Sequence, residues 1–549
     1  MINFRTTFSK LNQKLPLSRA AALLAGSSLI ASLLGLFRER IFNSLYYITY
    51  PTGADAYRVA FSIPDFMFII LVSGALSVSF IPVFNQRLTS GNKKSAWELS
   101  TSIINLMALA TLVTSVLIII FAEPLVRYVV GPGLDESSRS LAVSMMRVIA
   151  VSPFLFAVAT VITSMQQAVG RFAFFALAPA LYNVGIIIGL LFFTNGINIF
   201  GWQLFDGGIM GVALGVVLGA MLQLLVSTVG LFGMGFDYRF KIYWKNKGFR
   251  QVLRLLPPRS LDQGIDYVNS IVETNLASRM VAGSVNAYQQ VTALVYMPIN
   301  LVGVAISTAA FPRMTERIAE GRPDLFKKEL QQVLRVIIWL ALPITVIAVI
   351  ARGYVVNFIV NGGDPYMASI LGILGISILF RSVYFISARS FYAQQDTKTP
   401  LYISLFTIAL NIVLAVTFTF VLKAGVQGLA WAAVIVSAVE LSVLFTLMAR
   451  RIKGLFDAPF IHAIGRMVSA AGFMALVTYG AVVLMPLSLT DQRFFDSFPK
   501  FTLITLASFV VYLFFCYLFK LPEVKPVLTR IQKILFKRPE VKDESSTHS

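Results

Sequence analysis

Cysteine and histidine are almost absent from this chain. Its 549 residues contain one cysteine, Cys516, and two histidines, His462 and His548, which lie far apart in sequence. A single cysteine excludes a disulfide framework within the chain, and so few Cys and His residues exclude a metal centre built from them. The phosphate-binding pattern G-x-x-x-x-G-K-[ST] is also missing, so we expect no nucleotide hydrolysis, no metal and no cofactor.

Charged residues are scarce as well, at 13% of the chain, whereas apolar residues make up 57%. Apolar windows of about 20 residues recur from one end to the other, which is typical of a polytopic helical membrane protein. The net charge of +20 would suit a nucleic acid, but Lys and Arg lie in short connections between the windows rather than in one stripe. We therefore predict an all-α polytopic membrane protein without a nucleic-acid partner.

About fourteen apolar windows are long enough to cross a hydrocarbon core of roughly 30 Å as helices. The basic and then apolar N-terminus has the character of a signal peptide, but its apolar stretch is long enough to span, so we count it as the first helix. The predicted helices are 18–38, 55–85, 99–122, 140–165, 173–194, 208–234, 251–279, 284–312, 330–351, 366–392, 400–422, 426–449, 463–487 and 500–519.

Alternate connections between these windows differ in charge. Basic residues gather in the N-terminal segment, after the second, sixth, eighth and twelfth windows, and in the segment 520–542. This side holds roughly 29 Lys and Arg against about 9 on the other side, so the positive-inside rule places both termini in the cytoplasm. Two termini on one side require an even number of helices, which supports fourteen.

The chain also contains an internal repeat. The segment "SGALSVSFIPVFNQRLTSG" matches "GVAISTAAFPRMTERIAEG" at a constant offset of 230 residues, and further pairs follow, such as Asn183 with Asn411 and Gly211 with Gly428. Each repeat holds six windows, an even number, so the two halves have the same membrane topology. Two-lobed carriers of this kind bind substrate between the lobes and alternate access, which favours a carrier over a channel.

The repeat sets the predicted organisation of the chain. The last two windows lie outside it, and the basic end of the chain is predicted to be disordered. The predicted parts are a cytoplasmic segment 1–17, an N-lobe 18–234, a cytoplasmic linker 235–250, a C-lobe 251–450, two further helices within 451–520 and a basic tail 521–549.

Ionisable residues within the apolar windows are the candidate binding residues. Each costs roughly 3 kcal/mol or more at the bilayer centre, so it normally faces a cavity or a partner. Arg147, Arg254 and Arg389 lie near window ends, where snorkelling to the headgroups explains them, and Arg259 with Asp266 could form an internal pair. The others are Arg38, Glu39, Arg40, Asp55, Arg58, Asp65, Asp262, Glu273, Arg381 and Glu440.

The triplet Arg38, Glu39 and Arg40 ends the first window at its outer boundary. Interfacial anchoring would explain it, but basic residues on the translocated side oppose the charge bias of the other connections and so favour an anionic ligand. Arginine presents a planar fork that suits phosphate. Successive helical residues point about 100° apart, so only part of the triplet can face one ligand.

Prolines and glycines predict two structural features of the windows. We expect Pro257 and Pro258 to break the helix 251–279, and Pro153 to bend the helix 140–165. Three glycines spaced by four residues, from 211 to 219, form a small-residue face that we interpret as a site of helix packing.

Six segments resemble the MurJ (MviN) family of lipid II flippases, which belongs to the MOP exporter superfamily. They are "LLGLFRER", "GADAYRVAFSIPD", "SGALSVSFIPVF", "VETNLAS", "GVAISTAAFPRM" and "GLAWA", within residues 18 to about 450. The resemblance implies a V-shaped, two-lobed fold of fourteen helices in the bacterial cytoplasmic membrane. It implies movement of an undecaprenyl-pyrophosphate-linked peptidoglycan precursor from the inner to the outer leaflet, with the pyrophosphate in a cationic cavity and the lipid tail beside the last two helices.

The resemblance also assigns residues and partners. Gly35 and Arg38 match the family's helix 1 glycine and cavity arginine, Glu39 its following acid and Asp55 the acid that opens helix 2. Glu273 and Asn411 fall where some members bind a cation, although Ala415 stands at a position that is polar there. The substrate-binding candidates are therefore Arg38, Glu39, Arg40, Asp55, Arg58, Asp65, Arg259, Asn286 and Arg381. The expected partners are the lipid-linked glycan, membrane lipids and the cell-wall synthesis machinery, with the protein itself acting as a monomer.

The chain departs from the family at three hallmark arginines of the cavity. Those positions hold Ser32, Phe68 with Ile69, and Ala293 in this chain. The acids that accompany them in the family are replaced by Ser73 and Tyr296. We predict that Arg58, Arg259 or Arg381 supplies the missing positive charge.

Several functions remain open at this point. The same cationic cavity would suit another polyprenyl-pyrophosphate-linked saccharide. A cation-coupled multidrug exporter would need an acidic cavity, which Arg38, Arg259 and Arg381 oppose. Two alternatives are not transporters. One is a membrane scaffold, and the other is a membrane-embedded glycosyltransferase. The enzyme would need a catalytic motif in a long outer loop, whereas the outer connections here are short and lack one. Without ATP, transport would draw on the membrane potential, at about 2.3 kcal/mol per charge per 100 mV, or on a gradient such as that of Na⁺.

Overall fold

The computed structural model describes residues 17–199, 202–488, 491 and 493–529. It gives the backbone alone for 17–22, 73–79, 197–199, 202–204, 257–263 and 265–266. Contacts between residues divide the chain into two compact units. Unit 1 comprises Met1–Val291, Val356–Met367 and Ile408–Ala432, and unit 2 comprises Thr292–Val355, Ala368–Thr407 and Ala433–Ser549.

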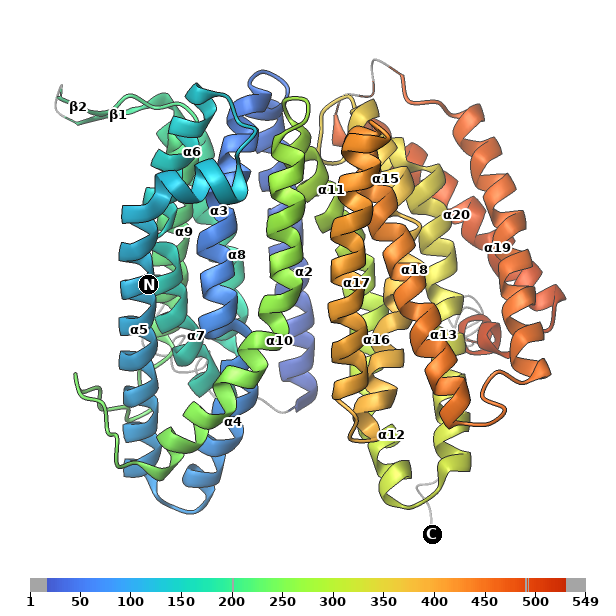
Figure 1. Ribbon diagram of the computed structural model, residues 1–549, viewed down its shortest axis with the longest axis horizontal. Helices are drawn as coiled ribbons and strands as arrows, with labels where there is room; N and C mark the ends of the chain where they lie inside the picture. Colours follow the sequence, from blue (N-terminus) through green and yellow to red (C-terminus); the bar gives the residue numbers. More distant parts are fainter. Residues whose placement is uncertain (1–16, 200–201, 489–490, 492, 530–549) are drawn as a thin grey trace, which may run out of the picture. The chain divides into compact units, whose positions relative to one another are not determined.

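Unit 1 contains most of the first half of the chain (Figure 1). The π-helical turns η1, η2 and η3 extend α2, α3 and α5, and η3 directly follows a proline, which lacks the N–H that regular helix hydrogen bonding needs. The elements are α2 (Leu17–Phe42), η1 (Asn43–Tyr47), α3 (Pro51–Phe68), η2 (Ile69–Ser73), α4 (Gly74–Thr89), α5 (Lys93–Pro124), η3 (Leu125–Val130), α6 (Glu136–Ile149), α7 (Ser152–Ala168), α8 (Ala173–Leu191), η4 (Phe193–Asn195), α9 (Met210–Val229), α10 (Lys247–Ser278) and η6 (Thr417–Val421), with the first part of α11 (Ser284–Pro298).

Unit 2 contains most of the later helices. Besides α11, four helices have residues in both units, namely α14 (Arg352–Asn357), α15 (Pro365–Leu374), α17 (Lys398–Val416) and α18 (Gly425–Arg451). The remaining elements are η5 (Ile299–Val304), α12 (Ala305–Ala319), α13 (Pro323–Ile350), α16 (Ser377–Ala393), α19 (Ala458–Leu484), α20 (Phe494–Leu518) and η7 (Pro522–Val524).

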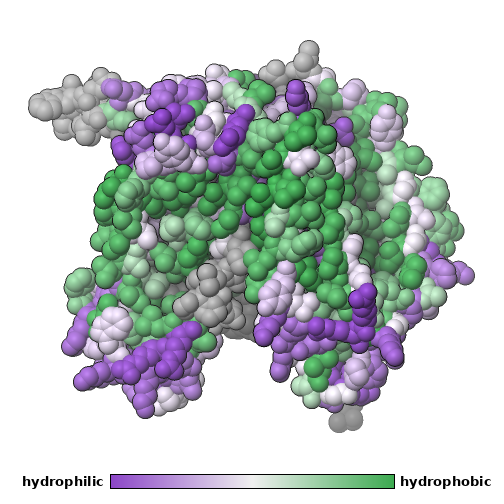
Figure 2. All heavy atoms as spheres, viewed as in Figure 1, coloured by the Kyte–Doolittle hydropathy of each residue, from purple (hydrophilic) through white to green (hydrophobic). Residues whose placement is uncertain are grey.

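Every predicted window coincides with helix. Within the described residues, eleven helices are long and apolar enough to cross a membrane, judged by length and composition. The other three windows correspond to α2, to α3 with α4, and to α10, which carry most of the candidate binding residues. The structure therefore confirms an all-helical polytopic architecture, whereas fourteen crossings stay a prediction. On unit 1, Figure 2 shows a band of apolar side chains between two polar ends, as a bilayer-embedded surface requires.

A short hairpin is the departure from helical structure in the described chain. Strand β1 (Ile197–Ile199) pairs antiparallel with β2 (Trp202–Phe205) in the connection between α8 and α9. The apolar windows did not predict it, because it lies between them.

Each unit has its own apolar core. In unit 1, α4, α5, α7 and α10 bury a cluster that includes Phe84, Leu99 and Phe249. In unit 2, α13, α16, α19 and α20 bury a cluster that includes Trp339 and Tyr512. The lobes 18–234 and 251–450 stay a prediction from the repeat, and α10, which the repeat assigns to the second lobe, packs within unit 1.

Glycines allow the backbones of α8 and α9 to touch. A Cβ atom added to Gly185 would lie 2.2 Å from Gly219 Cα, and one added to Gly189 would lie 2.5 Å from Gly215 Cα. Any larger side chain would force the helices apart, so the small residues permit close packing. The structure confirms the packing role predicted for the glycines of α9.

The two predictions made from prolines have different outcomes. The window 140–165 is interrupted, because α6 ends at Ile149 and α7 begins at Ser152, with Pro153 in its first turn. The break predicted at Pro257 and Pro258 is wrong, because α10 runs without interruption from Lys247 to Ser278. The helix accommodates the prolines, and Figure 1 shows it change direction along its length.

Candidate functional site

The candidate site in unit 1 is centred on Glu39 near the end of α2. Glu39 Oε1 lies 2.5 Å from Arg38 Nη2, and Glu39 Oε2 forms an ion pair with Arg58 Nη2 of α3. The side chains of Arg38, Glu39 and Arg58 keep 22, 18 and 15% of their surface exposed, respectively. One carboxylate thus holds two guanidinium groups together in a partly accessible cluster with one net positive charge.

Two other helices position these arginines. Arg38 Nη1 donates to Asn183 Oδ1 of α8 at 3.0 Å, and Asn183 Nδ2 donates to the main-chain oxygen of Ala31 at 3.2 Å. A Cβ atom at Gly35 would lie 3.9 Å from Asn183 Oδ1, in ordinary van der Waals contact, so Asn183 packs against α2 at this glycine with room for a methyl group. Arg58 Nε donates to Asn286 Oδ1 of α11 at 2.8 Å.

Aromatic rings flank Arg58. Its Cζ atom lies 5.3 Å from the ring centroid of Phe42 and 5.7 Å from that of Tyr57. Cation–π contacts of this kind hold a guanidinium in place without neutralising its charge. Arg58 therefore has a defined orientation, and its Nη1 atom donates no hydrogen bond to a described residue.

A buried amide network continues from Asn286. Gln290 Nε2 donates to Asn286 Oδ1 at 3.0 Å and to Asn43 Oδ1 at 2.7 Å, and Asn43 Nδ2 donates to Gln290 Oε1 at 2.7 Å. Asn43 also donates to the main-chain oxygen of Ile359 at 2.8 Å. These amides are nearly inaccessible, so their role is to connect α2, α11 and the segment 356–367 within unit 1.

Asp55 is placed as a helix cap. Its carboxylate accepts hydrogen bonds from the main-chain N–H of Gly283 at 2.7 Å and of Asn286 at 2.8 Å, at the start of α11. The side chain is 3% exposed. A buried carboxylate at a helix N-terminus accepts hydrogen bonds from otherwise unpaired N–H groups and is attracted by the positive end of the helix dipole. Asp55 therefore has a structural role.

Arg40 and Asp65 have partners other than Glu39. Arg40 Nη1 donates to the main-chain oxygen atoms of Asn357 at 2.7 Å and Phe358 at 3.1 Å. Asp65 lies beside the hydroxyl of Tyr267 on α10. As helix geometry predicts, the triplet 38–40 is divided, with Arg38 and Glu39 in the cluster and Arg40 bound to the main chain.

The remaining cationic candidates are Arg381 and Arg259. Arg381 belongs to α16 in unit 2, where its Cζ atom lies 5.8 Å from the ring centroid of Tyr296. Arg259 lies on α10, and its side chain is outside the described residues. Of the three arginines predicted to supply the missing charge, Arg58 is the one that the structure places beside Arg38.

A second polar group in unit 1 surrounds Glu273. Asn411 Nδ2 of α17 donates to Glu273 Oε1 at 3.0 Å and to Asn269 Oδ1 at 2.9 Å, and Asn269 Nδ2 donates to Glu273 Oε1 at 3.0 Å. Asn411 Oδ1 is buried and has no hydrogen-bond partner among the described residues. Carboxylate and amide oxygens are the ligands that hard cations prefer, so these three side chains fit an ion such as Na⁺. Within the described residues, no group of three or more His, Cys, Asp or Glu could hold a metal ion.

The sequence interpretation missed several residues of both groups. It did not select Asn43, Gln290, Asn269 or Asn183 as site residues. The repeat nevertheless contained a signal, because Asn183 and Asn411 are counterparts at an offset of 228 residues. The structure places Asn183 on Arg38 and Asn411 on Glu273.

Comparisons with known proteins identify the family of this chain. The sequence model of the family described as lipid II flippase MurJ matches residues 46–495. The chain belongs to the MurJ family of lipid II flippases. A probable lipid II flippase MurJ of Bdellovibrio bacteriovorus is 25% identical over 479 residues, which cover 85% of this chain and 88% of that protein. The family resemblance is therefore confirmed.

Solved structures share the fold of this family member. A MurJ structure described as inward closed has a TM-score of 0.71 and 22% identity, and the match covers 94% of this chain and all of that one. An inward-facing MATE multidrug resistance transporter of the MOP superfamily has a TM-score of 0.66 and 17% identity, with coverage of 80 and 99%. Because both identities are below 25%, the similarity shows the fold alone, which is that of the MOP transporters.

Proposed function

We propose that this protein moves lipid II, the undecaprenyl-pyrophosphate-linked peptidoglycan precursor, from the inner to the outer leaflet of the bacterial cytoplasmic membrane by alternating access. The observation that carries the proposal is the pair of arginines held by Glu39. Two guanidinium groups side by side suit a pyrophosphate, because each can donate parallel hydrogen bonds to its oxygens. Family membership supports the same substrate.

Glu39 acts in this proposal as an internal stand-in for the substrate anion. It keeps Arg38 and Arg58 together when no substrate is bound, which avoids leaving two like charges unpaired in a low-dielectric region. An entering pyrophosphate makes the same contacts with more oxygens and engages Arg58 Nη1.

Complementation tests the proposal. The MurJ protein of a tractable bacterium is depleted, this gene is supplied, and lipid II accessible at the outer leaflet is measured. We expect restored accessibility and growth. A well-expressed and correctly inserted protein that restores neither would overturn the proposal.

Energy coupling belongs to the same proposal. The chain uses no ATP and acts as a transporter rather than an enzyme, so an inside-negative membrane potential would drive outward movement of the anionic substrate. Asn269, Glu273 and Asn411 would bind Na⁺ and link its gradient to the cycle. Both termini lie in the cytoplasm, and the protein works as a monomer alongside the cell-wall synthesis machinery.

A second candidate follows from the missing family arginines. Ser32, Phe68 and Ala293 stand where the family resemblance places cavity arginines, so the groups that contact the substrate beyond its pyrophosphate differ. The alternative substrate is another polyprenyl-pyrophosphate-linked saccharide. Rescue of growth in cells that lack a different flippase of that class, without rescue of lipid II accessibility, would favour this alternative.

A further inference from the structure

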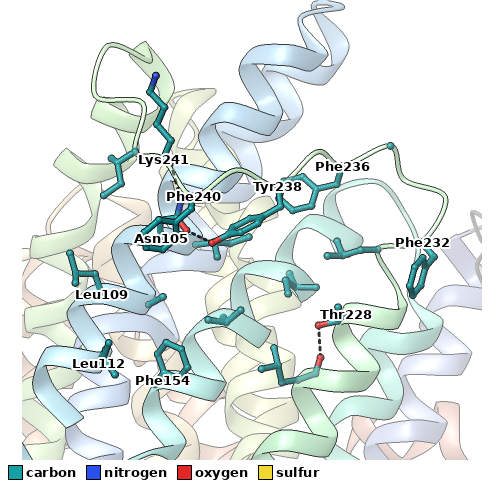
Figure 3. Close-up of a pocket in the computed structure, with 18 of the residues that line it drawn as sticks. Asn105, Leu109, Leu112, Phe154, Thr228, Phe232, Phe236, Tyr238, Phe240 and Lys241 are labelled. Atoms are coloured by element: carbon teal, nitrogen blue, oxygen red, sulfur yellow. Dashed lines mark hydrogen bonds between the residues drawn. The ribbon is translucent and has the colours of Figure 1, made fainter. Parts of the chain in front are cut away.

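Unit 1 has an apolar cavity whose lining includes no residue of the Glu39 cluster (Figure 3). It has a volume of about 1180 Å³ and lies between α5, α7, α9 and the segment 231–242. Its lining is mainly apolar, with Leu109 and Leu112 from α5 and Phe154 from α7. Cavities of roughly 300–1,000 Å³ hold ligands of drug size, so this one is large enough for a substantial apolar group.

Asn105 holds the segment that covers this cavity. Its Nδ2 atom donates to the main-chain oxygen atoms of Arg239 and Lys241, both at 3.0 Å. Its Oδ1 atom accepts a hydrogen bond of 2.6 Å from the hydroxyl of Tyr238. The Asn105 side chain is buried. These hydrogen bonds fix the segment against α5, and the cavity stays open to the surface where Leu109 and Leu112 are exposed.

A basic cavity adjoins the apolar one. Lys241 and Ile242 line both, and Figure 3 shows the side chain of Lys241 extending away from the apolar lining. The Glu98 carboxylate of this cavity lies 3.3 Å from Asn246 Nδ2. The charged residues that line the basic cavity are Arg87, Lys94, Glu98, Lys241, Lys245 and Lys247. Five cations against one acid favour an anionic ligand.

The surface around the cavities has the pattern of a membrane interface. Leu109, Leu112 and Ile120 are exposed along α5, which is the pattern of a lipid-facing helix. Phe240 is 92% exposed and Trp244 is also exposed, close to the basic cavity. Aromatic residues gather where hydrocarbon meets headgroups, so the two cavities lie on either side of that boundary.

We propose that the two cavities together bind one anionic phospholipid of the surrounding bilayer. Its acyl chains occupy the apolar cavity, and its phosphate lies against Lys241 and Lys245. A neutral lipid would leave the cations unmatched, and a soluble anion would leave the apolar cavity without a ligand. Basic pockets beside membrane helices recognise anionic headgroups by the same electrostatics. This site is separate from the Glu39 cluster and does not depend on the transported substrate.

Native mass spectrometry of the purified full-length protein tests the site. The probes are phosphatidylglycerol and phosphatidylcholine with identical acyl chains, titrated separately. We expect phosphatidylglycerol to bind at least threefold more tightly. The double variant Lys241→Gln/Lys245→Gln should remove this preference, whereas Lys328→Gln/Lys453→Gln, which removes two exposed charges of unit 2, should keep it.

A second pair of variants tests the apolar cavity. Ala108 of α5 lines it and Ala110 does not. Ala108→Phe should weaken phosphatidylglycerol binding at least threefold by filling the space, whereas Ala110→Phe, the same change on the same helix, should not. Thermal unfolding of each variant establishes that it is folded.

Three outcomes would overturn the proposal. Equal binding of the two phospholipids would remove the electrostatic basis. Competition by glycerol 3-phosphate as effective as that by the intact lipid would show that a soluble anion is the ligand. Undecaprenyl phosphate that binds this site in preference to phosphatidylglycerol would assign it to the transported lipid. None of these measurements depends on flipping, so the proposed function stands or fails separately.

Discussion

Glu39 of α2 and Arg58 of α3 form an ion pair across nineteen residues of chain, and Arg38 pairs with the other oxygen of the same carboxylate. The pair joins α2 and α3 at the point where both carry charge into an apolar region. It also brings two arginines together around one carboxylate.

Arg58→Ala should lower lipid II accessibility at the outer leaflet about tenfold in complemented cells. A hydrogen bond to a charged group contributes roughly 1.5–3 kcal/mol, and 1.4 kcal/mol corresponds to a factor of ten. Arg58→Lys keeps the charge but loses the planar fork and should fall between wild type and Arg58→Ala. Arg147→Ala, which removes an exposed arginine of α6, is the control and should leave accessibility unchanged. Equal accessibility in Arg58→Ala and wild type would contradict the assigned role.

Asp55→Ala should destabilise the protein by about 1–3 kcal/mol, because two buried N–H groups at the start of α11 lose their acceptor. Asp55→Asn keeps one acceptor oxygen and should lose less. Thermal unfolding of the purified variants in detergent measures the effect. A melting temperature of Asp55→Ala equal to that of wild type would exclude the capping role.

Sodium binding should appear as a stabilisation specific to Na⁺. A ligand that binds only the folded protein raises its melting temperature, so wild type should unfold at a higher temperature in NaCl than in KCl at equal concentration. Glu273→Gln and Asn411→Ala should abolish this difference. Asn183→Ala, at the repeat counterpart of Asn411, should retain it. No difference between the two salts in wild type would argue against a Na⁺ site.

Gly185→Ala should destabilise unit 1 by roughly 1–3 kcal/mol, the usual cost of overpacking, because the new Cβ atom would lie 2.2 Å from Gly219 Cα. Gly472→Ala is the matched control. Its Cβ atom meets nothing within 4 Å, so the better helix propensity of alanine should leave stability unchanged or raised by up to about 1 kcal/mol. Similar melting temperatures for the two variants would show that the α8–α9 contact is loose.

The stability of the folded protein should depend on pH at low pH, because of Asp396 in the connection before α17. Burial acts to raise the pKa of Asp396, but hydrogen bonds from Thr399 and the ion pair with Arg451 outweigh it and lower the pKa from 3.8 to about 2. The carboxylate therefore stabilises the fold above about pH 3.8, and this contribution disappears as the pH falls through about 2.

Asp396→Asn tests this dependence. At pH 7 the variant should be less stable than wild type by roughly 0.2–1 kcal/mol, the usual value of a partly exposed ion pair, because it loses the charge that pairs with Arg451. The difference in melting temperature should shrink as the pH falls from 4 to 2. A difference that stays constant over this range would show that the charge of Asp396 does not contribute.

The sequence by itself determined the membrane helices and the family. All fourteen apolar windows became helix, because crossing a bilayer requires about 20 consecutive apolar residues, which is a local property of the chain. The small-residue face of α9 could also be predicted, because the spacing of glycines along one helix is local. At Pro153 the sequence predicted a bend, and the structure has a break between α6 and α7. The outcome at Pro257 could not be predicted, because whether a helix continues through a proline depends on what surrounds it.

Only the tertiary structure decided which polar residues act together. Arg38 meets Asn183 across 145 positions, and Arg40 meets the main chain of Asn357 across 317. No spacing rule connects residues so far apart, because their contact depends on how whole helices pack. The sequence could therefore select Arg38, Arg40 and Asp55 as one class of charged residue, whereas the packing gave each a different partner: a carboxylate and an amide for Arg38, carbonyl groups for Arg40 and a helix N-terminus for Asp55.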